Sequence, residues 1–563
     1  MPSLPSFRAV LLTACLSLPL VSCGGGGGDA GSPTGPTLPS GPSDVTISAA
    51  AGTPDARLAC FRGTPDAECQ LRLYQVMVEA FADGDPTVGY GTGYGTSPHR
   101  GDLVGITNAL DHIQRTGVNA LWLTPIFRST AIAGQDDWAD RLDATGYYAS
   151  DYFQVDPKFG TDAQFRALVD AAHARGMRVF LDGVFGHYKG NLAASPTGKL
   201  PKNGVCTTLG GTPPPGPNQA CADWSDPATA AFFQEVATHW ITTYKIDGWR
   251  LDQAYQVPVG AWATLRNAVA DASAATTYTG ADGVPVHPMG HLVAEIWADE
   301  RAIQAHGYGT AAAPALASAF DFPGRYRLVQ TLAGEEALAT SRKANLPATT
   351  LAEAHGTYAA YPAHAKPNLM LTNHDLVRFG DLVQRAGLGN PDEDRYWRRH
   401  KAAFAFLAAH SGPITVYYGD EIGQELPNYA AQVSGNCAVA GLCDDHVSRT
   451  AGRTTGLNAR EADLQAHVGT LLALRDTHPA LAVGSRTHLH SDATLYVDRK
   501  DAGDDHVLFL LNTGTGERTV TLKADVIGSP AALTDLLAGG TVTAGADGFV
   551  IVLPPLSARF LSF

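Results

Sequence analysis

Residues 247–252 read "DGWRLD", in which Arg250 stands two residues before Asp252. Side chains alternate across a strand, so Arg250 and Asp252 would point to the same side of a strand formed here. Seven further β-rich runs recur along the chain, separated by longer segments in which apolar residues have helical spacing, such as 162–176. The eight runs are 74–81, 120–127, 178–185, 247–252, 292–297, 316–322, 368–375 and 414–421.

Several of these runs are apolar throughout, as expected of strands that are covered on both faces. Eight such strands with helical crossovers predict an α/β fold, a (β/α)8 TIM barrel, which we assign to residues 58–187 and 225–480. A doubly wound open sheet is the alternative, and the number of strands favours the barrel.

Two segments depart from the alternating pattern. Residues 188–224, after the third run, are rich in Gly, Pro and Asn, and predict a small loop domain inserted beside the mouth of the barrel. Residues 481–563 contain short alternating runs separated by turn residues, and predict a C-terminal antiparallel β-sandwich.

The beginning of the chain has the features of an export signal. Residues 1–22 combine Arg8 with an apolar core too short to span a bilayer. The segment "LVSC" resembles a bacterial lipobox, which would make Cys23 the lipidated residue; a plain secretory signal is the alternative. Residues 23–57 predict a flexible tether. We therefore expect an exported protein of the bacterial cell envelope, attached to the membrane only by its N-terminal lipid.

Six further cysteines form three pairs that are close in sequence. An even number of locally paired cysteines in an exported chain indicates disulfides, with a metal cluster as the weaker alternative. The cysteine pairs are Cys60 with Cys69, Cys206 with Cys221, and Cys437 with Cys443.

The chain carries a net charge of −15, which argues against a nucleic-acid partner.

Polar residues stand where the predicted strands end, and the active site of a barrel lies at the carboxyl ends of its strands. One carboxylate there could simply cap the next helix, but several that converge with an arginine and two histidines indicate chemistry. Cleavage of a glycosidic bond needs an acid and a second carboxylate on the opposite face of the sugar ring. We expect Arg250 to keep Asp252 ionised, and the apolar neighbours of Glu295 to raise its pKa. The residues at the strand ends are Asp182, His187, Arg250, Asp252, Glu295, His374 and Asp375.

Four short segments in this order resemble glycoside hydrolase family 13, the α-amylase family: 182–187, 248–252, 295–297 and 372–375. The resemblance covers roughly residues 71–563. It implies that Asp252 is the nucleophile, that Glu295 is the general acid and base, and that Asp375 binds sugar hydroxyls. It also implies that the reacting sugar is held by the substrate-binding residues Tyr147, His187, Arg250, His374 and Asp182, among which Asp182 mainly braces the site.

The chemistry requires no cofactor, but the resemblance bears on structural calcium. Gly186 stands where the family usually has an asparagine that binds calcium, so that site is not expected. Asp83, Asp85 and Asp102 resemble a different calcium loop near the first strand and are a possible metal site.

The expected function is retaining hydrolysis of α-1,4-glucans or maltooligosaccharides. A transglycosylase or isomerase on the same scaffold, acting on maltooligosaccharides, cyclodextrins, sucrose or trehalose, is the first alternative. A non-catalytic glycan-binding protein is the alternative from another class; the presence of all three catalytic carboxylates weighs against it.

Overall fold

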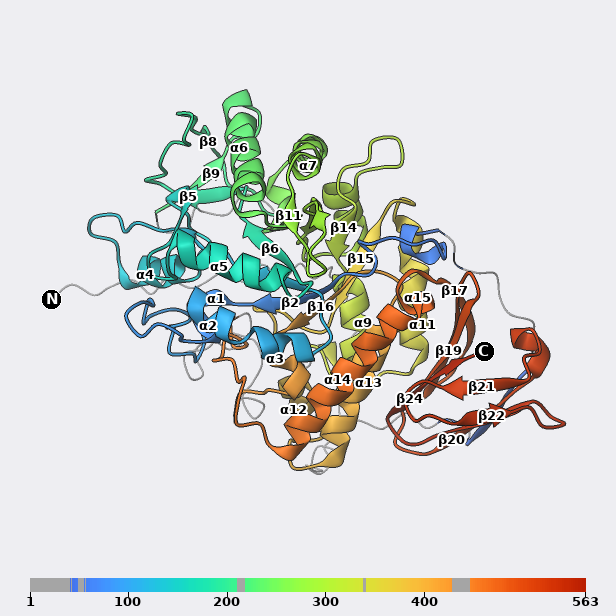
Figure 1. The fold of residues 1–563 in the computed structure, drawn as a ribbon. Helices are drawn as coiled ribbons and strands as arrows, with labels where there is room; N and C mark the ends of the chain where they lie inside the picture. The colour runs from blue at the N-terminus through green and yellow to red at the C-terminus, as the bar shows by residue number, and fades with distance from the viewer. Residues whose placement is uncertain are drawn as a thin grey trace, which may run out of the picture.

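Eight parallel strands close into a barrel at the centre of the structure (Figure 1). The computed structural model describes residues 41, 43–48, 55, 57–209, 218–337, 341–427 and 446–563. Each predicted run overlaps one barrel strand, which confirms the TIM barrel. The strands are β2 (Arg72–Val76), β3 (Ala120–Leu123), β6 (Arg178–Gly183), β10 (Gly248–Leu251), β13 (His291–Ala294), β14 (Ser318–Phe320), β15 (Lys366–Met370) and β16 (Ile414–Tyr417).

The register of the barrel strands places Arg250 beside Asp182. Strand β10 lies between β6 and β13, and Arg250 is paired with Asp182 on one side and with Val293 on the other. All four residues of β10 are buried. The arginine and the aspartate therefore meet inside the barrel because the strands pair in this register.

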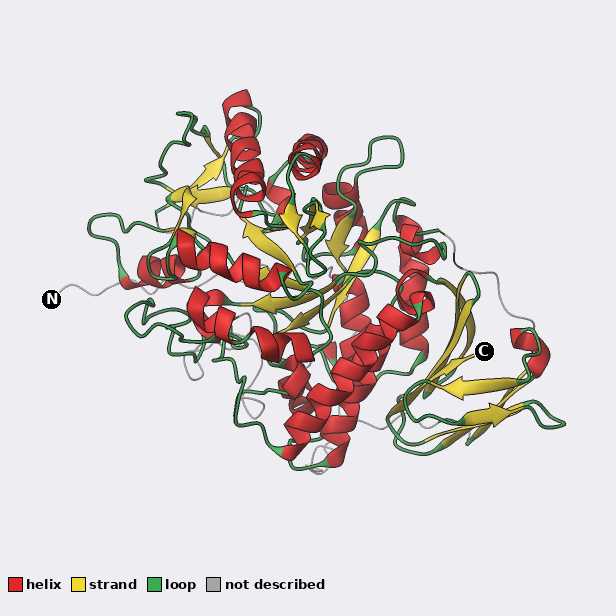
Figure 2. Ribbon diagram, in the orientation of Figure 1, coloured by secondary structure: helices red, strands yellow, loops and turns green. Residues whose placement is uncertain are grey.

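Helices cover the outside of the barrel (Figure 2). Helix α5 shows why they form where the sequence predicts: Thr161 and Gln164 make a reciprocal capping box at its N-terminus, and Phe165, Leu168 and Val169 are buried. The longer covering helices are α5 (Asp162–His173), α6 (Pro227–Tyr244), α7 (Val259–Ala274), α9 (Phe322–Leu332), α13 (Asp394–Ala408) and α14 (Ala459–Thr477).

The segment inserted after β6 forms a small three-stranded sheet of β7 (His187–Lys189), β9 (Gln219–Ala222) and β8 (Asn203–Gly204). The predicted disulfide between Cys206 and Cys221 is present. A buried ion pair between Lys189 and Asp143 connects β7 to α4 (Asp137–Ala144), in the loop that follows β3. The two loops beside the mouth are thus attached to each other.

The C-terminal region contains two packed sheets. One sheet has the order β17-β18-β19-β24-β21-β22, and the other has the order β1-β20-β23. Apolar residues of both sheets, including Leu508 and Ile551, form a common core. The strands are β17 (Ser485–Ser491), β18 (Leu495–Ala502), β19 (Asp505–Asn512), β20 (Arg518–Leu522), β21 (Ala532–Asp535), β22 (Thr541–Thr543), β23 (Phe549–Leu553) and β24 (Ser557–Ser562).

Strand β1 (Asp44–Ile47) corrects the predicted tether. It pairs in parallel with β20, from Asp44 opposite Thr519 to Ile47 opposite Leu522. Ile47 is buried in the common core, and this burial explains why part of a segment rich in Gly, Ser and Pro is ordered. The flexible segment expected over 23–57 is therefore interrupted by a strand of the C-terminal sheets.

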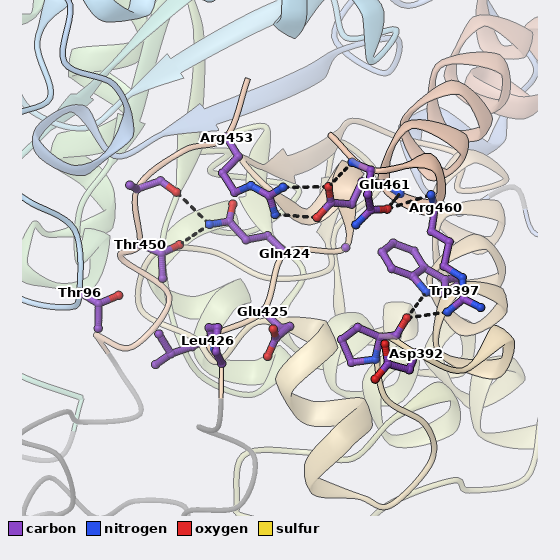
Figure 3. Close-up of a pocket in the computed structure, with 15 residues that line it drawn as sticks. Thr96, Asp392, Trp397, Gln424, Glu425, Leu426, Thr450, Arg453, Arg460 and Glu461 are labelled. Carbon is purple, nitrogen blue, oxygen red and sulfur yellow. Dashed lines mark hydrogen bonds and ion pairs between the residues drawn. The ribbon is translucent and has the colours of Figure 1, made fainter. Parts of the chain in front are cut away.

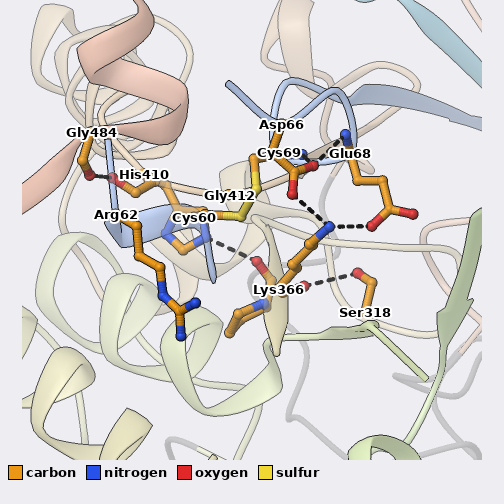
Figure 4. Close-up of a disulfide and its surroundings, with 12 residues drawn as sticks. Cys60, Arg62, Asp66, Glu68, Cys69, Ser318, Lys366, His410, Gly412 and Gly484 are labelled. Carbon is orange, nitrogen blue, oxygen red and sulfur yellow. Dashed lines mark hydrogen bonds and ion pairs between the residues drawn. A yellow bond between two sulfur atoms is a disulfide. The ribbon is translucent and has the colours of Figure 1, made fainter. Parts of the chain in front are cut away.

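A second predicted disulfide, Cys60–Cys69, lies beside the base of the barrel (Figure 4). Between its two cysteines, Asp66 and Glu68 both form ion pairs with Lys366 of β15. The disulfide and the ion pairs together fix the chain just before it enters β2. The predicted signal 1–22, the lipidation residue Cys23 and the pair Cys437 and Cys443 lie outside the described residues.

Within the described ranges, no helix has both the length and the apolar composition needed to cross a bilayer.

Candidate active site

One guanidinium group joins the predicted catalytic residues. Arg250 Nη1 donates to Asp182 Oδ1 at 2.7 Å and to Asp252 Oδ1 at 2.9 Å, and Nη2 lies 3.1 Å from Glu295 Oε2. These residues come from β6 and from the ends of β10 and β13, so the predicted convergence of strand ends is present. Asp252 and Glu295 thus contact the same guanidinium through its two terminal nitrogens, which places both carboxyl groups in one site, as retaining cleavage by a pair of carboxyl groups requires.

The two oxygens of Asp252 have different surroundings. Oδ1 accepts the hydrogen bond from Arg250, whereas Oδ2 is buried and has no hydrogen-bond partner among the described residues. A buried carboxylate oxygen without a partner is costly unless a ligand uses it. Just after it, Gln253 has a left-handed backbone (φ 39°), and its N–H donates to Glu295 Oε2 at 2.9 Å. The turn that follows Asp252 therefore also contacts the second carboxylate.

Burial governs the protonation of this pair. It raises the pKa of Asp252 to about 7 and that of Glu295 to about 7, although Arg250 lowers both. The expectation that Arg250 keeps Asp252 ionised thus identifies the right contact, but burial outweighs it. Burial thus favours the protonated form of both carboxyl groups, and retaining cleavage uses one protonated and one ionised carboxyl group.

Asp375 differs from this pair because it has its own arginine. Arg449 Nη2 lies 2.6 Å from Asp375 Oδ1, and Arg449 Nε donates to the carbonyl of His374. Burial opposes the charge on Asp375, but His374 and Arg449 together lower its pKa to about 2. Arg449 was missed in the sequence because it follows no strand and belongs to none of the four segments.

His374 is held as a neutral hydrogen-bond donor. Tyr147 Oη donates to Asp182 Oδ2 at 2.7 Å, so its oxygen must accept from His374 Nε2, at 2.8 Å. The proton of His374 is then on Nε2, and Nδ1 accepts from Gln75 Nε2. Burial lowers the pKa of His374 to about 3, so it remains neutral at physiological pH.

His187 is held in the opposite tautomer. Its Nδ1 donates to Gln256 Oε1 at 3.0 Å, which leaves Nε2 as an acceptor, and burial lowers its pKa. Gln256 reaches this place because residue 186 is a glycine: a Cβ at Gly186 would collide with Gln256 Oε1. The departure from the family pattern at Gly186 therefore makes room for the partner of His187.

This coupling predicts a non-additive pair of substitutions. Gln256→Ala removes the acceptor, and Gly186→Ala displaces it, so each should lower kcat/KM about fivefold, the equivalent of one neutral hydrogen bond of about 1 kcal/mol. The double variant should lose no more than either single variant, because both act on one contact. Initial rates and the ¹⁵N shifts of His187 measure the effect; additive losses with an unchanged tautomer would contradict it.

Asp182, Tyr147 and Trp297 differ in their burial and contacts. Asp182 is 0% exposed, and its hydrogen bonds within the described structure go to Arg250 and Tyr147. Tyr147 is buried, with its ring parallel to that of His374 at 5.6 Å. Trp297, beyond Glu295, stacks on Phe322 but is 42% exposed.

The predicted metal residues Asp85 and Asp102 accept hydrogen bonds from groups of their own loops. Both oxygens of Asp102 accept backbone N–H groups, from Gly84 and Asp85 on one side and Gly105 on the other. The Asp85 carboxylate accepts from the N–H and hydroxyl groups of Thr87. Among the described residues, no group of three or more His, Cys, Asp or Glu side chains is arranged to bind a metal ion. Here the aspartates shape the loop, as Asp also does in ordinary turns.

A cavity of about 620 Å³ lies apart from the carboxylates (Figure 3). It is lined by Trp397, Gln424 and the ion pair of Arg453 with Glu461, among others, and by none of the predicted catalytic or substrate-binding residues. The contacts around Arg250 therefore define the candidate active site, and this cavity does not.

Known proteins resemble the chain in sequence and in structure. A family model described as "Alpha amylase, catalytic domain" matches residues 75–194 and 217–454. A cyclomaltodextrinase of Geobacillus thermopakistaniensis is 26% identical over 520 residues, which cover 86% of this chain and 75% of the relative. Neopullulanase 2 of Thermoactinomyces vulgaris is also 26% identical, over 87% of this chain and 77% of its own.

A solved structure of AmyP in complex with maltose is 50% identical to this chain, with a TM-score of 0.82 over 88% of this chain and 97% of AmyP. A second AmyP structure, in complex with maltotriose, has the same values.

Proposed function

We propose that this chain, which belongs to the α-amylase family of glycoside hydrolases, hydrolyses α-1,4-glucosidic bonds with retained configuration. The expected substrates are maltooligosaccharides and starch-like glucans. The similarity to AmyP, which binds maltose and maltotriose, supports an oligosaccharide substrate. The names of the sequence relatives support the same class of substrate.

The partnerless Oδ2 of Asp252 is the observation that carries the proposal. This oxygen attacks the anomeric carbon, and the bond from that carbon to the leaving oxygen breaks. Glu295 gives its proton to the leaving oxygen. Glu295 then takes a proton from water, the water oxygen bonds to the anomeric carbon, and the ester to Asp252 breaks. Two inversions leave the configuration unchanged.

Product analysis tests this proposal. Maltoheptaose should give shorter maltooligosaccharides whose new reducing ends first appear as the α-anomer in ¹H NMR spectra. Starch, cyclodextrin, pullulan, sucrose and trehalose complete the panel. Initial β-anomer would contradict double displacement, and accumulation of products longer than the substrate would identify a transglycosylase.

We also propose that the protein is exported and lipidated at Cys23. The disulfides Cys60–Cys69 and Cys206–Cys221 support an oxidising compartment. Incorporation of a labelled fatty acid in cells that produce the full chain, and its loss in Cys23→Ser, is the expected result; equal labelling of both would contradict it.

A further inference from the structure

A row of aromatic side chains leads away from Asp375 along the mouth of the barrel. It consists of Tyr148, His446, Tyr94 and Trp138, which we call the aromatic row. Tyr94 lies in the loop after β2, and Trp138 and Tyr148 lie in the loop after β3. Both loops leave the carboxyl ends of barrel strands, the end at which the catalytic carboxylates also stand.

The contacts of the row begin at Arg449, the residue that binds Asp375. The backbone N–H of Arg449 donates to the carbonyl of His446 at 3.2 Å. The ring of His446 lies 4.6 Å from that of Tyr94, almost perpendicular to it, and Tyr94 lies 5.5 Å from Trp138. The row therefore extends from the partner of Asp375 to the outer rim, where Trp138 is 52% exposed.

Tyr148 connects the row to the reacting carboxylates. Its ring lies 5.5 Å from that of His187. Burial, together with the nearby charge of Asp252, raises the pKa of the Tyr148 phenol to about 12, whereas Arg449 lowers it. Tyr148 thus lies near both Asp252 and Arg449.

Two features of the row are unexplained by packing within the protein. The hydroxyl oxygen of Tyr94 is buried and has no hydrogen-bond partner among the described residues. Trp138 contacts Tyr94 edge-on, yet it leaves about half of a large apolar side chain in water. Aromatic rings with a polar group nearby suit a ligand that has both apolar faces and hydroxyl groups.

We propose that Tyr94 and Trp138, with His446 and Tyr148 beside them, bind the sugar units of an α-glucan that precede the bond to be cut. This inference rests on the proposed function and extends it to chain length. Tyr148 of the row lies near Asp252, whereas Glu295, which protonates the departing sugar, is followed by Trp297, which stacks on Phe322. We therefore place the departing part of the chain beside Trp297 and not along the row. The row holds the part that remains attached to Asp252. The enzyme therefore cuts internal bonds and retains two or more units, not a single terminal glucose.

The test compares long and short substrates in one variant. Trp138→Ala should lower kcat/KM for maltoheptaose about tenfold and leave that for p-nitrophenyl α-glucoside within twofold. Trp138→Phe, which keeps a ring, should restore most of the loss. Val552→Ala, at an exposed position of the C-terminal sheets, is the control and should change neither. Equal effects of Trp138→Ala on both substrates, or none on either, would overturn the inference.

Binding and product size separate this inference from the proposed function. In a Glu295→Gln background, Trp138→Ala should weaken the calorimetric affinity for maltoheptaose but not for maltose. Wild-type enzyme should also cleave maltoheptaose that is chemically blocked at its non-reducing end. A wild-type enzyme that cleaves no α-glucan would refute the proposed function. A wild-type enzyme that cleaves α-glucans but releases only glucose, and does not attack the blocked substrate, would refute only the inference about the aromatic row.

Discussion

Asp252→Asn and Glu295→Gln should each lower kcat on maltoheptaose by at least about a thousandfold while the protein stays folded. Asp252→Asn removes the attacking oxygen, and Glu295→Gln removes the proton donor. Both amides are nearly isosteric with the carboxyl groups, and burial already disfavours the charges, so stability should be preserved. Initial rates and urea unfolding curves measure the two properties.

A substrate that needs no protonation distinguishes the two roles. With α-maltosyl fluoride, whose leaving group departs as an anion, Glu295→Gln should still form the glycosyl-enzyme, detectable by mass spectrometry. Asp252→Asn should not. Asp111→Asn, a substitution of an exposed carboxylate, is the control and should behave as wild type. Near-normal rates in either site variant, or a glycosyl adduct on Asp252→Asn, would contradict the assignment.

Arg250→Lys should lower kcat about a hundredfold and move the acid limb of the pH profile upward. A lysine has a single nitrogen and cannot contact Asp182, Asp252 and Glu295 at once as the guanidinium does. Arg250 is the strongest influence that lowers the pKa of Asp252, so a weaker contact raises this pKa. Because Asp252 attacks only when ionised, activity at pH 5–6 should fall more than activity at pH 8.

Arg325→Lys provides the matched control for this experiment. Arg325 is also fully buried and forms an ion pair with Glu336, and no hydrogen bond or ion pair joins it to Asp252, Glu295 or Asp375 among the described residues. It should lose stability without a shift of the pH profile. A profile of kcat/KM against pH that is unchanged in Arg250→Lys would show that the guanidinium does not control the charge of Asp252.

The barrel and its carboxylates could be predicted because their signals are local. Each strand is an apolar run in sequence, and each catalytic residue stands at the end of a run, where barrel geometry brings them together. Arg449 has no such signal: its role depends on a contact with Asp375, 74 positions away. The tautomers of His374 and His187 likewise depend on Gln75 and Gln256, whose side chains carry no distinctive pattern in sequence.

The raised pKa of Asp252 was also beyond sequence reasoning. The proximity of Arg250 to Asp252 can be inferred from strand alternation. Whether Arg250 or burial has the larger effect on the pKa of Asp252 cannot. Strand β1 was missed for a similar reason, because "DVTI" is too short to indicate a strand without its distant partner.

The pairing of β1 with β20 has a consequence for how the chain folds during synthesis. The N-terminal strand emerges from the ribosome early, yet β20, on which it docks, is made about 470 residues later, a wait of roughly a minute at ordinary elongation rates. During this interval Ile47 has no core to enter. The C-terminal sheets can therefore be completed only after translation is almost finished. Because β1 and β20 are so far apart in sequence, we expect their pairing to be a late step in folding.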